Sequence, residues 1–175
     1  MDIIKLYLRL IMRERFADIT AKPDAPFLGG SFYISNLCNS CDATVGSVSF
    51  KEGDAVNAFA AFMTEIEKMK RFGFTDGEVQ RAKDNIISSF EQAVEAAPTR
   101  KNADFVHPLL YNFYNNEAYM TPETELQLAQ ALCASINAVV LNQIAAQVVT
   151  DENMVILYNG PEKEGLVNPT EQQLL

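Results

Sequence analysis

Three cysteines and one histidine are the side chains of this sequence best suited to bind a transition metal or to act as a redox pair. Cys38 and Cys41 form a lone C-x-x-C motif. Two thiolates at that spacing can share a zinc ion, but a closed zinc site needs about four ligands, and Cys133 and His107 lie far away in the sequence. A redox C-x-x-C usually opens a helix, whose N-terminus stabilises the thiolate, whereas this motif falls between two strand-like runs. We therefore favour a turn that carries two thiols, and a small metal-binding or redox protein stays open as an alternative.

His107 lacks the partners that histidine chemistry requires. A single histidine cannot form a multi-histidine metal site, and we interpret His107 as a partly buried helix residue. The sequence also lacks H-x-x-E-H, H-E-x-x-H, a Walker loop and G-x-G-x-x-G, the motifs that place metals or phosphates on a fold. Gly29-Gly30 is too short for a phosphate-binding loop and predicts a backbone joint before a strand. We accordingly assign no catalytic, cofactor-binding or metal-binding residue from motifs.

Residues 100–116 are rich in aromatic side chains and predict a helix that Pro108 interrupts. Such a stretch can face a ligand as an aromatic platform, or it can form a core contact between helices. The core contact is the interpretation that we favour. The residues that make the stretch aromatic-rich and apolar include Phe105, Leu109, Tyr111, Phe113 and Tyr114.

The length and charge of the chain limit the classes of protein to consider. Its 175 residues suit one domain with a substantial core. A net charge of −9 opposes binding to nucleic acid or to an anionic membrane. No apolar run approaches the roughly 20 residues that span a bilayer, and residues 1–5 lack the order of a signal peptide. From these residues we expect a cytoplasmic protein or a piece of a longer precursor, and the compartment of such a parent stays unknown.

The apolar spacing predicts the elements that would position any site. It indicates a helix over residues 2–17 and two strands, over 31–37 and 43–50, that pair as an antiparallel hairpin. Further helices should begin after Asp54, at a capping box from Thr75 to Glu78, after Thr121 and after Ser135. The apolar run 153–159 predicts a strand buried on both faces.

These elements predict an α+β fold with an antiparallel sheet and helices packed on one face. Three visible strands are too few for so many helices, so we expect that the sheet lacks its first strand upstream or is completed by another domain. We expect residues 1–160 to form a single domain that is incomplete at its N-terminus, and residues 161–175 to form a linker toward a following domain.

Three segments together resemble the pitrilysin (insulinase-like) zinc metallopeptidases. The first is RERFADI at 13–19 followed by KPDAPFLG at 22–29, which is similar to a helix end and strand entry of bacterial members. The second, GFTDGEVQRAK at 73–83, is similar to the junction G-(F/I)-T-(D/E)-x-E-(L/V)-x-x-A-K. The third is YNGPEK at 158–163 followed by NPTE at 168–171, similar to the last strand of one family domain and the connection to the next.

The resemblance implies a specific architecture and chemistry. Members carry similar α+β domains of the type found in mitochondrial processing peptidase, in two halves that close around a peptide. Two histidines of H-x-x-E-H and a distal glutamate hold zinc in the first domain, and the motif glutamate activates the bound water. The substrate peptide is expected to pair with a sheet edge as an added strand. This chain most resembles the second, non-catalytic domain, so zinc is expected in the catalytic domain of the parent and no cofactor in this segment.

The sequence also departs from the family at two further positions. Late family domains can carry an arginine and a tyrosine that stabilise the reacting carbonyl. The aligned positions here are Thr20 and Phe27, which offer neither a charge nor a phenol. Arg13 and Arg15 are the nearby substitutes, although we interpret both as surface groups at a helix end.

Two functional hypotheses follow from the resemblance. The first is a non-catalytic scaffold and substrate-chamber segment of a zinc-dependent endopeptidase, inactive alone and partnered by other domains of its parent or by a catalytic subunit. The second is an enzymatically inactive relative that acts as a binding or assembly module. An H-x-x-E-H motif in the parent chain or in a partner would distinguish the first from the second.

Overall fold

The structure is a computed structural model that describes residues 2–38, 41–116, 118–150 and 152–175, apart from the side chains of residues 37 and 38. The chain folds as α1 (Ile3–Thr20), β1 (Gly29–Cys38), β2 (Cys41–Ser49), α2 (Ala55–Phe72), α3 (Asp76–Ala96), the short 3-10 turn η1 (Ala97–Thr99), α4 (Ala103–Asn115), α5 (Pro122–Ser135), α6 (Ala138–Ala145) and α7 (Glu171–Leu174). The α+β class predicted from the sequence is therefore correct.

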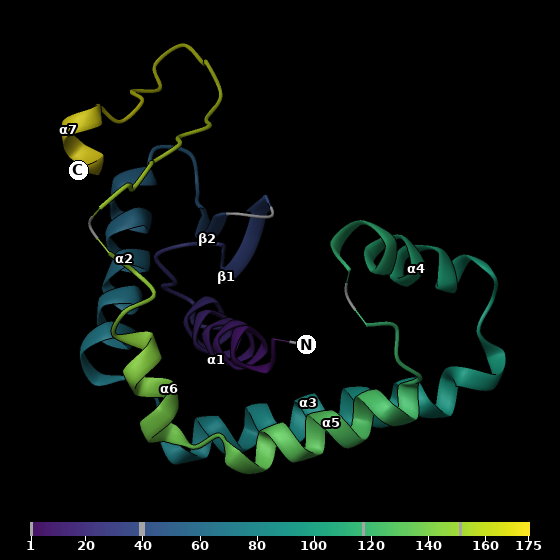
Figure 1. The fold of residues 1–175 in the computed structure, drawn as a ribbon. Coiled ribbons are helices and arrows are strands. Elements are labelled where there is room, and N and C mark those ends of the chain that lie inside the picture. The colour runs from purple at the N-terminus through teal and green to yellow at the C-terminus, as the bar shows by residue number, and fades with distance from the viewer. Residues whose placement is uncertain (1, 39–40, 117, 151) are drawn as a thin grey trace.

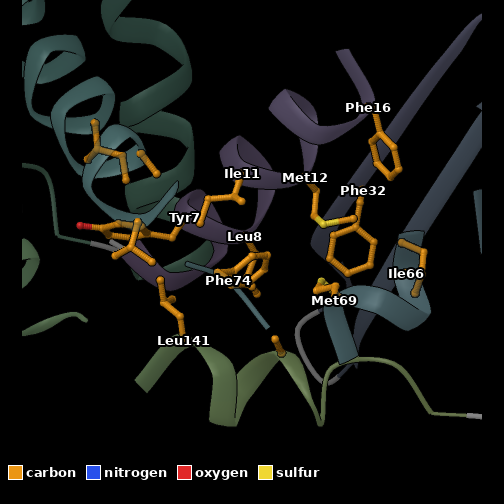
Figure 2. Packing of buried hydrophobic residues seen from close by; sticks show 14 of the residues in the cluster. Tyr7, Leu8, Ile11, Met12, Phe16, Phe32, Ile66, Met69, Phe74 and Leu141 are labelled. Atoms are coloured by element: carbon orange, nitrogen blue, oxygen red, sulfur yellow. The ribbon is translucent and has the colours of Figure 1, made fainter. Parts of the chain in front are cut away.

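Helix α1 lies at the centre of the fold, between the hairpin and the pair α3 and α5 (Figure 1). One apolar stripe of the helix is almost completely removed from water, as its three-and-four spacing predicts. Figure 2 shows this stripe packed among side chains of β1 and α2, together with Phe74 and Leu141. The buried residues of α1 are Ile3, Tyr7, Leu8, Ile11, Met12 and Phe16.

The sheet consists of β1 and β2, paired antiparallel with Phe32 opposite Gly46 and Gly30 opposite Val48. Helices α1 and α2 pack on the face of the hairpin that carries Gly30, Phe32 and Gly46. A Cβ atom on Gly30 would lie 3.0 Å from the ring of Phe16, and one on Gly46 would lie 2.9 Å from the ring of Phe62. The two glycines thus let aromatic rings approach the strands closely, and Phe16 and Phe62 stack with ring centroids 5.0 Å apart.

The strand predicted over 153–159 is wrong for the part of the chain that the structure describes. Asn153 lies in a turn with φ +56°, and residues 154–159 form no strand, while the side chains of Met154, Val155 and Leu157 are half-exposed or exposed. Val148, which precedes this segment, contacts β2, where Thr44 Oγ1 donates to its carbonyl at 2.7 Å. An apolar run becomes a buried strand only where neighbouring strands cover it, and the described sheet offers none.

Two helix predictions also need correction. Helix α4 continues through Pro108, because an exposed helix can bear the loss of one N–H donor when water solvates the freed carbonyl. Helix α6 is capped by Asn137, whose side chain accepts from the N–H of Val140 at 3.0 Å, rather than by Ser135. Ser135 instead ends α5, where its hydroxyl donates to the carbonyl of Leu132.

Helices α3 and α5 lie side by side and carry α4 at their far end, away from α1 and the hairpin (Figure 1). The buried residues of α3, Val79, Ala82 and Ile86, all belong to its first half. No residue of α4 is buried. We call α4 and the distal parts of α3 and α5 the arm, and the rest of the folded chain the body.

The predicted linker, 161–175, includes the short helix α7, which lies near α2. Lys163 Nζ also lies 3.0 Å from the carboxylate of Glu52. The division into a domain and a linker stays a prediction.

Among the described residues, no single helix is both long enough and apolar enough to cross a bilayer, and only the pair α5 and α6, bent by 86°, passes that test together.

Candidate functional site

The C-x-x-C motif lies at the turn of the hairpin. Cys38 ends β1 and its backbone is in register with Cys41, the first residue of β2. The thiol of Cys41 is exposed, and its Sγ lies 3.8 Å from the carbonyl oxygen of Asp42. The side chain of Cys38 and the two residues between the cysteines lie outside the described residues. Because strands rather than a helix flank the motif, the helix N-terminus that would stabilise a redox thiolate is missing from its described surroundings.

The other metal donors considered from the sequence lie on separate elements. Cys133 is buried in α5, next to Tyr7 of α1. His107 is exposed on α4, where its ring lies 4.5 Å from that of Tyr111. The interpretation of His107 as partly buried is therefore wrong, because no element in the described part of the chain covers it. No group of three or more His, Cys, Asp or Glu side chains in the described part of the chain could hold a metal, so these donors do not fit the zinc site of a metallopeptidase.

Among the described residues, Tyr7 carries the one buried side-chain polar atom that has no hydrogen-bond partner. Its hydroxyl is buried and makes no hydrogen bond to the described residues. Burial raises the pKa of Tyr7 far above its usual value, and the neighbouring Cys133 thiol raises it further. Tyr7 therefore stays a neutral phenol and is unsuited to transfer a proton at ordinary pH.

Arg15 is held in a structural junction and is not the surface group expected from the sequence. Its Nε and Nη2 donate to the two carboxylate oxygens of Glu78 at 2.6 and 3.0 Å, and Nη2 also donates to the carbonyl of Gly73 at 2.8 Å. The guanidinium lies 5.0 Å from the ring centroid of Phe74. This bidentate geometry uses the planar fork of arginine fully. Arg15 is therefore unavailable to stabilise a reacting carbonyl, while Arg13 is exposed.

Glu78 also completes the capping box of α3. The side chain of Thr75 accepts from the N–H of Glu78, and the carboxylate of Glu78 accepts from the N–H of Thr75 at 2.8 Å. Burial opposes ionisation of Glu78, but the hydrogen bonds from Arg15 and Thr75 outweigh it and lower its pKa to about 2. One carboxylate thus connects the end of α1 to the start of α3.

Asn142 adds a third element to this junction. Its Oδ1 accepts from the N–H of Phe74 at 2.6 Å, and its Nδ2 donates to the carbonyl of Phe74 at 3.2 Å. Gly73 precedes this pair with φ +67°, a conformation that glycine tolerates. We call Arg15, Gly73, Phe74, Glu78 and Asn142 the α1–α3–α6 junction. The capping box was visible in the sequence, but the roles of Arg15 and Asn142 were not.

Of the two family-aligned positions, Phe27 lines a shallow hollow and Thr20 is the last residue of α1. Thr20 donates its hydroxyl to the carbonyl of Ala17 at 3.1 Å. Phe27 is buried against the edge of Phe16, and it lines an open hollow of about 410 Å³ between residues 22–27 and α2. Among the polar groups that line the hollow, the carboxylate of Glu65 is already paired with Lys68 at 2.6 Å. The described lining contains no nucleophile and base in hydrogen-bond contact.

The aromatic stretch 100–116 does not form the expected core contact. Its large side chains on α4 are exposed or half-exposed. Arg100 stacks over Phe105 with its Cζ 4.6 Å from the ring centroid, and Phe113 contacts Tyr114 edge to face. The stretch is thus a partly apolar surface at the end of the arm.

Comparison with known proteins gives a fold likeness to a protease. No family model matches the chain, and no curated protein matches it in sequence. The fold is similar to part of the first half of the periplasmic protease PqqL from Escherichia coli, with a TM-score of 0.70 and 19% identity over 81% of this chain and 31% of that one. In the structure of the periplasmic protease PqqL, the TM-score is 0.71 and the identity 19%, over 82% of this chain and 16% of that one. The chain therefore spans about a third of the first of these structures and about a sixth of the second.

Proposed function

We propose that this chain is a non-catalytic scaffold and substrate-chamber segment of a zinc-dependent endopeptidase of the pitrilysin type. The observation that carries this proposal is the fold likeness to a periplasmic protease, which extends over 81% of the chain. The protease class is also the one that the resemblance at residues 13–29, 73–83 and 158–171 implies.

The distribution of donor side chains supports a non-catalytic role. A hydrolytic zinc site needs three protein ligands around one open position, whereas His107, Cys133 and Cys41 lie on α4, α5 and β2. Arg15 is neutralised by Glu78. We therefore derive no hydrolytic step from this chain, and the zinc and its general base would belong to another domain or to a partner subunit.

Helices α1 and α2 pack closely against one face of the hairpin. Phe16 and Phe62 press on Gly30 and Gly46 from the helical side, while Ser31 and Ser47 contact each other on the other face through their hydroxyls at 2.8 Å. That second face carries these serines together with Tyr33, which lies opposite Val45. A peptide that adds as a strand would find the free backbone groups of the hairpin edges beside this face.

The first experiment measures peptide hydrolysis by the purified chain. A quenched fluorescent peptide is incubated with the protein with zinc added, and separately with a chelator. We expect no turnover above buffer in either condition, and no difference for His107→Ala. Turnover that disappears with the chelator and with His107→Ala would overturn the proposal.

The second experiment identifies the parent. The native protein is isolated from its source, and its full sequence and stable partners are determined by mass spectrometry. The proposal expects H-x-x-E-H in the same polypeptide or in a stoichiometric partner, together with peptide hydrolysis that needs zinc. A parent and partners without that motif would reject the peptidase assignment.

The exposed apolar surface of α4 favours a second candidate function. An inactive relative that acts as a binding or assembly module would need such a surface, and monomeric proteins rarely leave a large one uncovered. The two candidates differ in the second experiment, because the module would be isolated without any zinc-dependent peptidase.

A further inference from the structure

Helix α4 leaves an unusually apolar surface uncovered at the end of the arm. Phe113 is 79% exposed and Tyr114 70%, and four further large side chains of the same helix are about half-exposed. Figure 1 shows α4 set apart from the body, with none of the labelled elements of the body beside it. We call this surface the α4 face; its exposed members are Val106, Leu109, Leu110, Tyr111, Phe113 and Tyr114.

Most of the α4 face belongs to two rows of side chains with a spacing of four residues, and Tyr111 lies outside both rows. Phe105, Leu109 and Phe113 form one row, and Val106, Leu110 and Tyr114 form the other. Side chains four apart form a ridge along a helix, and two neighbouring ridges enclose a groove. Two identical helices of this kind can insert the ridge of one into the groove of the other. The face is therefore complementary to a copy of itself.

The charge of the face selects against a charged partner. Within Ala103–Asn115 the one residue with a formal charge at neutral pH is Asp104, although the whole chain carries a net charge of −9. A basic or acidic partner would find no complementary charges on this helix. A second copy needs none, because it presents the same uncharged apolar surface.

The area of the face is close to what a symmetric dimer requires. With about 200 Å² for each aromatic side chain and about 100–150 Å² for each aliphatic one, the exposed fractions of the residues in the two rows correspond to about 500 Å² on each copy. Two such faces bury about 1,000 Å² in total, which is the least that a specific interface needs.

We propose that α4 is a self-association helix through which two copies of this chain form a two-fold symmetric dimer. In a two-fold dimer each copy uses the same patch, so the two α4 helices cross near their midpoints, at Leu109 and Leu110. This inference is independent of the proposed scaffold role, which does not depend on the exposure of α4, and it shares the exposed α4 surface with the second candidate function.

The test measures the mass of the full 175-residue chain by sedimentation equilibrium over a wide range of concentrations. We expect a monomer–dimer equilibrium with no larger species. Phe113→Asp should raise the dimer dissociation constant by about a hundredfold, as loss of a buried aromatic anchor from both copies implies. Phe72→Asp is the matched control, since Phe72 at the end of α2 is also 79% exposed, and it should leave the constant unchanged.

Salt provides an independent readout. Two copies with nine negative charges each repel one another, and salt screens this repulsion. The dimer should therefore strengthen as the salt concentration rises, whereas association through charged pairs would weaken.

A cross-linking arm locates the contact and does not depend on the behaviour of Phe113→Asp. In a chain with Cys38→Ser and Cys41→Ser, Leu110→Cys should form an intermolecular disulfide under mild oxidation, because the two positions lie near the two-fold axis. Val139→Cys, exposed on α6, should not. A chain that stays monomeric at all concentrations, that assembles without limit, or that dimerises equally with Phe113→Asp would overturn the proposal, as would the absence of the Leu110→Cys cross-link.

Discussion

Glu78 connects α1 to α3, so replacing it tests how much one partly buried carboxylate contributes to this fold. In Glu78→Gln the side chain keeps its length but loses its charge. The bidentate pair with Arg15 and the charge-assisted bond from the N–H of Thr75 are then lost or weakened. We expect the free energy of unfolding to fall, because Arg15 keeps its partly buried charge without a counterion.

The size of the effect follows from the pKa of Glu78. A decrease from 4.5 to about 2 corresponds to about 3 kcal/mol of preference for the ionised form in the folded state. The side chain is partly exposed, and solvent screening reduces the effect to roughly 2 kcal/mol. The folded pKa lies below the unfolded one, so this stability is complete above about pH 4.5 and is lost as the pH falls toward 2.

The assay is urea unfolding of wild type and Glu78→Gln at several pH values between 3 and 7, followed by circular dichroism. The difference between the two proteins should be roughly 2 kcal/mol at pH 7 and less than half of that at pH 3. Glu52→Gln is the control, because Glu52 pairs with Lys163 on the surface, where both side chains are about 60% exposed. That change should cost less than about 0.5 kcal/mol. A difference for Glu78→Gln that is negligible at pH 7, or equal at pH 3 and pH 7, would refute the reasoning.

Two further substitutions test the junction and the core. Gly73→Ala should lower the free energy of unfolding in urea by about 2–3 kcal/mol, because φ +67° strains any other residue and the added Cβ would overlap the side chain of Asn142. Gly29→Ala is the control, because an added Cβ there meets nothing within 4 Å and should change the stability little. Equal effects of the two substitutions would contradict this account. Tyr7→Phe should leave the free energy of unfolding unchanged or raise it by up to about 1 kcal/mol, because it removes a buried hydroxyl that has no hydrogen bond to the described residues. A clear loss of stability in the variant would show that the hydroxyl has a partner. In a spectrophotometric titration of the native wild type, Tyr7 should be the last of the tyrosines to ionise.

Local signals in the sequence predicted much of the body. The spacing of apolar residues identified the buried stripe of α1, and Thr75 with Glu78 identified the start of α3. These predictions succeeded because periodicity and caps depend on residues within one or two turns of each other. The hairpin register also placed Phe32 and Tyr33 on opposite faces, as the alternation requires.

The predictions that failed depended on distant neighbours. Helix α2 buries Ala58 and Phe62, whereas Phe59 and Met63 of the same helix stay partly exposed. Gly46 explains the difference, since it admits the ring of Phe62 against the strand. No pattern of neighbouring residues in the sequence reveals that the ring of Phe62 will pack against Gly46.

The arm contradicts the expectation that clustered aromatic residues belong to a core. On α4 the rule fails because α3 and α5 pair with each other and extend beyond the body, so the described elements of the body do not cover the helix at their end (Figure 1). A signal was nevertheless present in the sequence. The two rows with a spacing of four cover about half of the helix circumference, and an apolar surface of that width on a helix needs a facing partner.

The body and the arm therefore meet different requirements. A two-stranded hairpin is marginally stable alone, and here Phe16 and Phe62 fix it from one side, while the junction at Glu78 holds α1, the helix that carries Phe16. Substitutions in the junction should consequently lower the stability of the hairpin and the helices together. The α4 face contributes no buried residue to this body, so Phe113→Asp should change association without lowering the midpoint of unfolding of the monomer. This separation allows the scaffold role and the self-association to be tested independently in the same protein.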